Sequence, residues 1–268
     1  MRREREITAA KAHPMNPTTL LEPLRRLAIS AGAEILRLRE VAAVRNKADA
    51  SPVTDADEAA ERLIVAGLAT LSPALPVVAE ELMAAGAKPE TGHAFWLVDP
   101  LDGTKAFIQG GGDFTVNIAL VEQRRPILGV VYAPALGDLY AGAAGAGASH
   151  AKNDGPARPI SCRVAPGDGV DVVASQMHGG RDDVDALLAG RRVRAVRRLS
   201  SSLKFCLVAA GEADLYPRRG ETSEWDTAAG HAVLLAAGGR VATLDGNELL
   251  YGKPDFRNPG FIAQGRAS

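Results

Sequence analysis

The sequence predicts a mixed α/β fold in which helices and sheets pack as layers. Two long segments, residues 20–38 and 54–71, have apolar residues at helical spacing. Short apolar runs between residues 75 and 132 are too short for helices and indicate strands, two of which are predicted to pair as an antiparallel hairpin. Similar mixed patterns follow in the second half of the chain, without a tandem repeat. Layered sheets and helices are therefore favoured over a closed barrel.

The composition narrows the class of protein. The chain has 268 residues, of which 46% are hydrophobic, enough for a substantial core. Thirty-one basic and 32 acidic residues leave a net charge of -1, which gives no global attraction to nucleic acid or to an anionic membrane. Two cysteines are too few for a disulfide framework. No segment has the roughly 18 apolar residues of a membrane helix. We expect a cytoplasmic protein, with peripheral association at the inner face of the membrane left open.

The first half of the chain provides the clearest element boundaries. Residues 1–16 are expected to form a flexible tail, followed by one folded domain at 17–268. Thr19 and Glu22 have the spacing of a capping box, which predicts the start of the first helix. The second helix is predicted to begin near Thr54.

The domain is expected to consist of two halves. Alternating residues at 114–120 and an apolar run at 127–132 predict the hairpin, with a turn at 123–126. The Ala/Gly-rich stretch 141–148 is the best candidate for a boundary, which gives sub-domains at about 17–150 and 151–268. The second half is expected to contain strands near Val172, Val193, Val241 and Ile262 and helices at 200–210 and 225–237.

The most informative motif lies at residues 96–105, where a predicted buried strand ends in an acid. Asp99 and Asp102 are three residues apart, and Gly103-Thr104 then enters a predicted helix. Crowded carboxylates raise one another's pKa, so they need a cation. Magnesium suits them because it is a hard ion that prefers oxygen ligands. The amides of Gly103 and Thr104 would form an anion site beside it. A metal and a phosphate can meet at this motif.

Further acids extend this candidate site. Glu80-Glu81 follow a predicted strand, and Asp226 lies at a predicted helix start. Alone, each acid has a structural interpretation: a turn for Asp99 and Asp102, a solvated strand end for Glu80-Glu81, an N-cap for Asp226. Together they predict a metal site at which four carboxylates converge with no internal cation to neutralise them.

Other phosphate-handling motifs fit poorly. Haloacid dehalogenase phosphatases have their two aspartates two residues apart, whereas Asp99 and Asp102 are three apart with a proline between them. The 141–147 run contains no Gly-Lys-Ser/Thr and is therefore no P-loop. The histidines show no metal-ligand spacing.

Three separated motifs resemble one known family. The order Asp57, Glu80-Glu81, Asp99-Pro-Leu-Asp102-Gly-Thr104 and Trp225-Asp226-Thr-Ala-Ala is similar to the lithium-sensitive, magnesium-dependent phosphatases of the inositol monophosphatase superfamily. The expected blocks follow in order from about residue 20 to residue 263. Within that superfamily, the segments 102–108, 114–120, 201–206, 214–218 and 224–231 most resemble the CysQ-type 3'(2'),5'-bisphosphate nucleotidases. Ala106 and Gly111-Gly112-Asp113 depart from that type, which usually has Glu and Asn-Gly-Glu there.

The resemblance implies an αβαβα layered sandwich with the active site between the two sub-domains. It implies that magnesium ions are held by Glu80, Asp99, the Leu101 backbone carbonyl, Asp102 and Asp226. Asp57 and Thr104, together with Glu80, would orient and deprotonate a metal-activated water. The amides of Gly103 and Thr104 would bind the substrate phosphate, Asp226 would also contact the substrate, and Glu81 would fix its neighbours.

The implied substrate is adenosine 3',5'-bisphosphate, cleaved to AMP and phosphate, which removes a by-product of sulfate assimilation. Lys204 and Arg218 are candidates to bind the distal 5'-phosphate, although both have an ordinary interpretation as structural charges. The alternatives are an inositol or sugar phosphate monoesterase with the same metal site, and a non-catalytic, metal-stabilised binding protein. The second is disfavoured because metal binding alone does not require Thr104 and Asp57. The oligomeric state stays open.

Overall fold

The computed structural model describes residues 16–47, 51–153, 155–176, 187–188 and 190–266. The tail expected at 1–16 thus lies, except for Asn16, outside the described residues. The helices are α1 (Pro17–Leu38), α2 (Asp55–Leu71), α3 (Glu80–Ala84), α4 (Thr104–Ile108), α6 (Leu203–Ala209) and α7 (Ala228–Ala236). The strands are β1 (Val44–Asn46), β2 (Pro52–Thr54), β3 (Val77–Ala79), β4 (Ala94–Asp102), β5 (Thr115–Glu122), β6 (Arg125–Ala133), β7 (Asp138–Ala143), β8 (Gly147–Lys152), β9 (Arg158–Ile160), β10 (Val170–Ser175), β11 (Val193–Leu199), β12 (Leu215–Arg218), β13 (Thr222–Ser223), β14 (Arg240–Thr243), β15 (Arg257–Asn258) and β16 (Phe261–Gln264).

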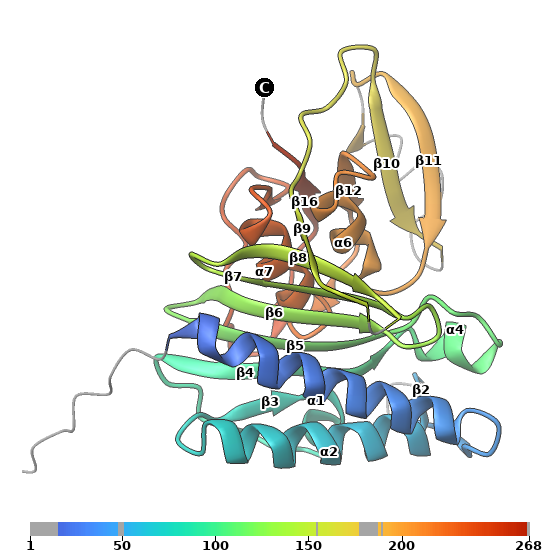
Figure 1. Ribbon diagram of the computed structural model, residues 1–268, viewed down its shortest axis with the longest axis vertical. Helices are drawn as coiled ribbons and strands as arrows, with labels where there is room; N and C mark the ends of the chain where they lie inside the picture. Colours follow the sequence, from blue (N-terminus) through green and yellow to red (C-terminus); the bar gives the residue numbers. More distant parts are fainter. Residues whose placement is uncertain (1–15, 48–50, 154, 177–186, 189, 267–268) are drawn as a thin grey trace, which may run out of the picture.

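A seven-stranded sheet with the order β3-β4-β5-β6-β7-β8-β9 forms the centre of the molecule. Its pairs are antiparallel except β3 with β4, which is parallel. Helices α1 and α2 cover one face and α7 packs on the other (Figure 1). The predicted β5–β6 hairpin is confirmed. Glu122 pairs with Arg125 across a two-residue turn, and both turn residues have positive φ, as a tight hairpin turn requires.

The side chains of the sheet alternate between two cores. Trp96 and Val98 pack in the core with α1 and α2, whereas Phe95 and Leu97 pack in the core with α6 and α7. Helix α7 approaches β6 closely, because Gly129 has no side chain. A Cβ at this position would lie 2.2 Å from the carbonyl oxygen of Ala229.

A second sheet, with the order β11-β10-β12-β16-β14, packs on the opposite side of α6 and α7 (Figure 1). Its residues also alternate: Val173 and Tyr216 join the core with α6, and Val172 and Leu215 pack outward against Leu188. The fold is therefore the expected mixed α/β sandwich.

Two sequence predictions for helix starts have different outcomes. The prediction for α2 is confirmed, because Thr54 is its N-cap and Asp57 completes a capping box. The capping box predicted at Thr19 is wrong, because Asn16 caps α1 and accepts a hydrogen bond from the Thr18 amide at 3.0 Å. Proline at the first helical position favours this earlier start, since its φ is already helical and no N–H is lost.

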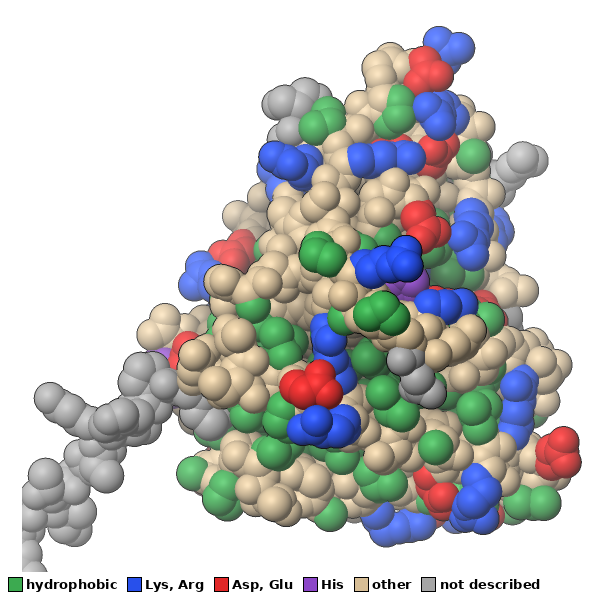
Figure 2. Space-filling view, in the orientation of Figure 1, with side chains coloured by type: hydrophobic (Ala, Val, Ile, Leu, Met, Phe, Trp, Pro, Cys, Tyr) green, Lys and Arg blue, Asp and Glu red, His purple; other side chains and the backbone are tan. Residues whose placement is uncertain are grey.

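The expected boundary region belongs to the first sheet. Residues 141–148 form much of the β7–β8 hairpin, and β9 then pairs with β8, so the first sheet extends to Ile160. In the part of the chain that is described, no helix is long and apolar enough to cross a membrane. Lys and Arg side chains are interspersed with Asp and Glu over the face drawn in Figure 2, which agrees with the near-zero net charge.

Candidate active site

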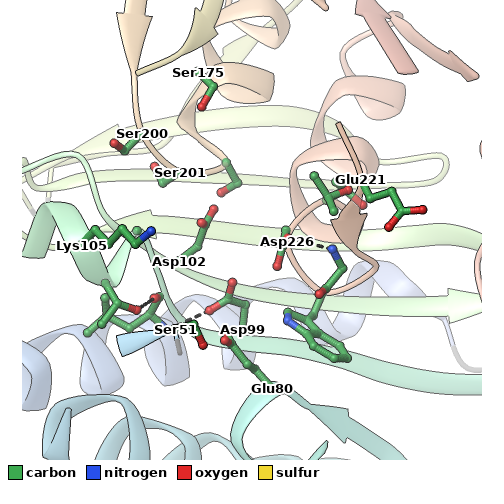
Figure 3. Close-up of a pocket in the computed structure, with 18 of the residues that line it drawn as sticks. Ser51, Glu80, Asp99, Asp102, Lys105, Ser175, Ser200, Ser201, Glu221 and Asp226 are labelled. Atoms are coloured by element: carbon green, nitrogen blue, oxygen red, sulfur yellow. Dashed lines mark hydrogen bonds between the residues drawn. The ribbon is translucent and has the colours of Figure 1, made fainter. Parts of the chain in front are cut away.

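A cleft of about 540 Å³ lies where the carboxyl end of β4 meets the segments that precede α6 and α7. One side, the acidic wall, consists of Glu80, Asp99, Asp102 and Asp226. The facing side, the polar wall, consists of Ser175, Ser200, Ser201, Ser202, Lys204 and Arg218. Figure 3 shows Asp99, Asp102 and Asp226 around the same cavity, with Ser175, Ser200 and Ser201 on the side away from Glu80.

The end of β4 explains how two aspartates three residues apart reach the same cleft. In a regular strand they would point to opposite faces. Asp99 pairs with Asn117 and Asp102 pairs with Thr115, so that β4 spans three residues where β5 spans two. This bulge adds one residue and turns the second aspartate toward the cleft. Gly103 then adopts a φ of 95°, in the left-handed region that favours glycine, and α4 begins.

Asp57 and Thr104, predicted as partners in water activation, are in direct contact. The Thr104 hydroxyl lies 3.1 Å from Asp57 Oδ1 and 3.1 Å from the Leu101 carbonyl oxygen. Asp57 Oδ2 accepts hydrogen bonds from the Thr54 amide at 2.8 Å and the Thr54 hydroxyl at 2.6 Å. Burial raises the pKa of Asp57 above its ordinary value. The capping box of α2 therefore also positions a carboxylate for the cleft.

An internal cation contacts the acidic wall, contrary to the expectation from the sequence. Lys47 Nζ lies 2.6 Å from Glu80 Oε1 and 2.8 Å from Glu81 Oε1. Burial tends to lower the pKa of Lys47, but the two glutamates outweigh it and raise that pKa above its ordinary value. The carboxylate of Glu61 accepts the amides of Glu81 and Leu82 at 2.7 and 2.9 Å, and so fixes the start of α3.

The remaining acids are poorly neutralised. Burial raises the pKa of Asp99 well above its ordinary value, and the charges of Glu80, Asp102 and Asp226 raise it further. The pKa of Asp226 is raised for the same reasons, by burial first and then by Asp102. Burial raises the pKa of Asp102 to about 6, although the charge of Lys204 opposes this. One buried carboxylate, that of Asp99, and two half-buried ones, those of Asp102 and Asp226, thus repel one another.

This set of donors fits a hard divalent cation. Oxygen ligands with several negative charges are what such an ion binds, and the repulsion among them is what it relieves. Among the described residues, no three His, Cys, Asp or Glu side chains already converge as a ligand group for a metal. Glu80 is in addition paired with Lys47, at 2.6 Å. Metal binding would therefore require Glu80 to change partner.

The polar wall is held together by its own contacts. Ser202 donates to Asn117 Oδ1 at 2.6 Å, and Asn117 Nδ2 lies 3.5 Å from Asp102 Oδ2. The carboxylate of Asp113 accepts the amide of Ser200 at 2.5 Å. Asp113, where the sequence departs from the CysQ-type pattern, thus still places a carboxylate beneath the serine segment.

Lys204 and Arg218 line the cleft but differ in exposure. Lys204 is 4% exposed, and its ammonium group donates to the carbonyls of Leu199 and Ser201 at 3.3 and 2.5 Å. Burial lowers the pKa of Lys204 to about 8. Arg218 lies at the rim and donates to the carbonyl oxygens of Gly220 and Glu221, both at 3.2 Å. Arg218 is therefore better placed to meet a ligand directly.

The structure brings every predicted site residue to this region, and it adds four that sequence reasoning missed. Glu80, Asp99, Leu101, Asp102, Gly103, Thr104, Lys204, Arg218 and Asp226 line the cleft, and Asp57 and Glu81 contact residues that do. The missed residues are Lys47, Glu61, Asn117 and Ser202. Lys47 directly follows β1, and its sequence neighbours gave no signal of a site, because its position depends on the pairing of β1 with β2.

Comparison with known proteins assigns this layered α/β fold and its acidic cleft to a phosphatase family. The chain belongs to the inositol monophosphatase family, whose profile matches residues 16–266. The chain is 45% identical over 246 residues to the 3'(2'),5'-bisphosphate nucleotidase CysQ of Salmonella typhimurium, covering 90% of this chain and 98% of the relative. Members of this family are generally metal-dependent.

Solved structures support the same relationship. The crystal structure of CysQ from Bacteroides thetaiotaomicron has a TM-score of 0.77 and 34% identity, and it covers 96% of this chain and 100% of its own. An inositol monophosphatase from Anabaena has a TM-score of 0.72 and 28% identity, covering 94% of this chain and 92% of its own. The fold is thus shared with both kinds of enzyme.

Proposed function

We propose that this phosphatase is a magnesium-dependent 3'(2'),5'-bisphosphate nucleotidase that hydrolyses adenosine 3',5'-bisphosphate to AMP and phosphate. The observation that carries the proposal is the two-sided cleft, with under-neutralised acids on one wall and Lys204 and Arg218 on the other. A bisphosphate has one phosphate for each wall. The 45% identity to a CysQ nucleotidase favours this substrate over inositol phosphates.

The proposed magnesium ligands are Glu80, Asp99, the Leu101 carbonyl, Asp102 and Asp226. When bound, magnesium supplies positive charge to the phosphate and makes water a stronger nucleophile. The amides of Gly103 and Thr104 would donate to the phosphate oxygens. Glu81, paired with Lys47 behind Glu80, would hold that segment in place.

Thr104 and Asp57 are proposed to receive the proton of the attacking water. The Thr104 hydroxyl can accept a hydrogen bond from water while it donates its own hydrogen to Asp57, 3.1 Å away. The raised pKa of Asp57 makes its carboxylate a better proton acceptor than an exposed aspartate. Glu80 faces the same side of the cleft and would help to orient the water.

The distal 5'-phosphate is proposed to bind at the polar wall. Arg218 would contact it from the rim with a charge-assisted hydrogen bond. Lys204 would contribute mainly through its positive charge and through the hydrogen bond that it donates to the Ser201 carbonyl. A cytoplasmic location, with or without peripheral membrane association, remains a prediction, as does a place in sulfur metabolism.

A phosphate-release panel tests the function. It compares adenosine 3',5'-bisphosphate, inositol monophosphate and fructose bisphosphate, each with magnesium and with excess chelator. We expect rapid, magnesium-dependent release from the nucleotide and much slower release from the other two. A preference for inositol or fructose phosphate would assign the chain to a monoesterase instead. Binding of magnesium without turnover of any ester would support a metal-stabilised binding protein.

A further inference from the structure

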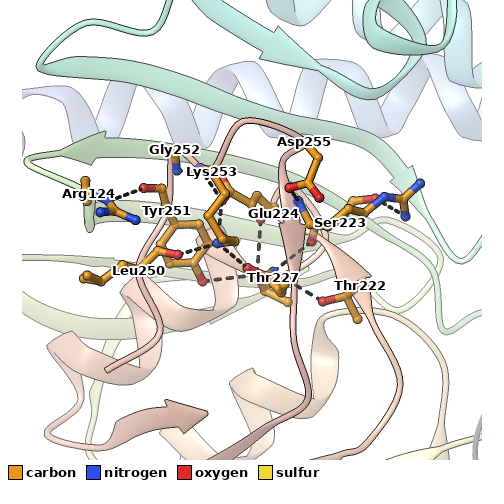
Figure 4. Close-up of polar contacts among 12 residues, drawn as sticks. Arg124, Thr222, Ser223, Glu224, Thr227, Leu250, Tyr251, Gly252, Lys253 and Asp255 are labelled. Atoms are coloured by element: carbon orange, nitrogen blue, oxygen red, sulfur yellow. Dashed lines mark hydrogen bonds and ion pairs between the residues drawn. The ribbon is translucent and has the colours of Figure 1, made fainter. Parts of the chain in front are cut away.

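A buried polar network lies directly behind the turn 223–227 that carries Trp225 and Asp226. Its members come from this turn and from the loop 250–258 (Figure 4). We call Glu224, Thr227, Tyr251, Lys253 and Asn258 the 224–258 network. All but Lys253 are at most 1% exposed, and the Lys253 side chain is 22% exposed.

Glu224 is the charged centre of this network. Its carboxylate accepts the amides of Gly252 at 2.7 Å and Lys253 at 3.0 Å, and the Lys253 ammonium lies 2.5 Å from Glu224 Oε1. The Glu224 amide also donates to the Phe256 carbonyl at 2.8 Å. A fully buried carboxylate needs all of these partners, because an unpaired buried charge is strongly unfavourable. The turn and the loop therefore depend on each other.

Asn258 and Tyr251 fix the other end of the turn. Asn258 Nδ2 donates to Thr227 Oγ1 at 2.8 Å and to the Ser223 carbonyl at 3.1 Å, while its Oδ1 accepts from Lys253 at 3.0 Å. The Tyr251 hydroxyl lies 3.1 Å from Thr227 Oγ1. The residues on both sides of Asp226 are thus anchored to one loop.

The Asp226 carboxylate depends on the shape of this turn. Its Oδ2 accepts the amide of Ser223, three residues earlier, at 2.8 Å. The carbonyl of Ser223 is in turn held by Asn258. If the turn shifts, the Asp226 carboxylate moves with it, and a hard cation that requires near-ideal ligand geometry is bound less well.

We propose that Glu224, with Lys253 as its counter-charge, is a positioning residue that sets the affinity of the cleft for its divalent cation by fixing Asp226. Glu224 itself lies outside the lining of the cleft, so that it would act on the cation only through Asp226. This inference rests on the proposed function, because it takes Asp226 as a magnesium ligand.

The test uses a matched pair of variants of the full chain. Glu224→Gln removes the charge and keeps the shape. Asp214→Asn is the control, because Asp214 is also a buried carboxylate, 3% exposed, that accepts a backbone amide, from Asp171 at 2.7 Å, and pairs with Arg163 at 2.8 Å. Asp214 does not line the cleft. Both variants are expected to lower the thermal midpoint of the metal-free protein.

Magnesium affinity is read from the midpoint shift on titration with magnesium and from calorimetry. Glu224→Gln is expected to weaken it by roughly 10-fold or more, and Asp214→Asn by less than about twofold. Lys253→Met keeps the amide contacts of Glu224 and is expected to weaken magnesium affinity by a smaller factor. If Glu224→Gln does not fold, the magnesium affinity of Lys253→Met decides the question. Equal affinities in the two matched variants, or unchanged affinity in Lys253→Met, would overturn the inference. Absence of any magnesium-induced shift in the wild type would instead overturn the proposed function.

Discussion

The two walls of the cleft satisfy their charges in opposite ways. On the polar wall, the ammonium group of Lys204 is bonded to two backbone carbonyls, as is the guanidinium of Arg218. On the acidic wall, the carboxylates of Asp99 and Asp226 lie among other acids that raise their pKa values. The two cations of the polar wall therefore have hydrogen-bond partners, whereas the acidic wall has too little positive charge to neutralise its carboxylates.

The two walls therefore have different roles in the proposed site. The dipoles and charges of the polar wall are already held in place, so an anion could bind there with little loss of conformational entropy. The carboxylates of the acidic wall repel one another, and a bound divalent cation would reduce this repulsion. Lys47 relieves part of it, but only at Glu80 and Glu81. Substitutions on the two walls should therefore affect different steps.

The largest effect is expected from loss of a carboxylate on the acidic wall. Asp99→Asn or Asp226→Asn should lower the rate of phosphate release by more than about 100-fold, since each removes an anionic ligand for magnesium. The same change removes repulsion, so the metal-free protein should unfold at an equal or higher temperature. Enzyme assays and thermal scans of both variants measure this. Near-normal turnover in a folded variant would exclude that aspartate from the site.

A smaller effect, confined to one substrate, is expected on the polar wall. Arg218→Ala should raise the Michaelis constant for adenosine 3',5'-bisphosphate by about 10- to 100-fold, because a charge-assisted contact worth roughly 1.5–3 kcal/mol is lost. Any hydrolysis of inositol monophosphate should change little, since that ester has no second phosphate. Arg219→Ala is the control, because Arg219 does not line the cleft. If both substrates are affected equally, Arg218 has a structural role.

We expect lithium to inhibit the enzyme by binding at the acidic wall. A monovalent ion in a magnesium position neutralises less of the charge on a phosphate, so lithium should inhibit turnover several-fold. Magnesium in excess should relieve this only in part if lithium binds after cleavage of the ester. Initial rates in lithium and in potassium at equal ionic strength measure the effect, and identical rates would contradict this arrangement of ions.

The smallest effect is a pH dependence of stability in the metal-free protein. Burial raises the pKa of Glu61 and of Glu81 to about 7, above the ordinary value of 4.5. The folded chain therefore binds more protons than the unfolded chain between these values, and its stability falls as the pH rises toward 8. Each group contributes at most about 1.4 kcal/mol per pH unit.

Thermal midpoints at about pH 6.5 and about pH 8, with chelator, measure this fall. His231 contributes little in this window, because burial lowers its pKa to about 3 and its titration affects stability below the ordinary value of 6.5. Magnesium should raise the midpoint more at the higher pH. A metal-free midpoint that rises with pH would contradict the raised pKa values of Glu61 and Glu81.

The sequence predicted those parts of the site that lie close together along the chain. The motif from Asp99 to Thr104 contains a strand end and a helix start within a few residues, and both were predicted from residue types alone, whereas the bulge between the two aspartates was not. The capping box at Thr54 and Asp57 was likewise local. The Thr19 capping box failed because Asn16 and Pro17 offered a competing local start.

The contacts that the sequence could not predict join distant segments. Lys47 reaches Glu80 only because β1 pairs with β2, and Asn258 reaches Ser223 only because β15 pairs with β13. Neither pairing has a local signal, since the strands are only two or three residues long. The expectation of acids without an internal cation was wrong for this reason.

In the proposed function, the acidic wall receives the 3'-phosphate of a nucleotide while the polar wall holds its 5'-phosphate. The most direct test is to identify, by chromatography, the nucleotide that the wild-type protein releases from adenosine 3',5'-bisphosphate with magnesium. Because the 3'-phosphate is the one cleaved, we expect adenosine 5'-monophosphate and one equivalent of phosphate, and no product with excess chelator. Adenosine 3'-monophosphate as the product, or undiminished release in chelator, would contradict it.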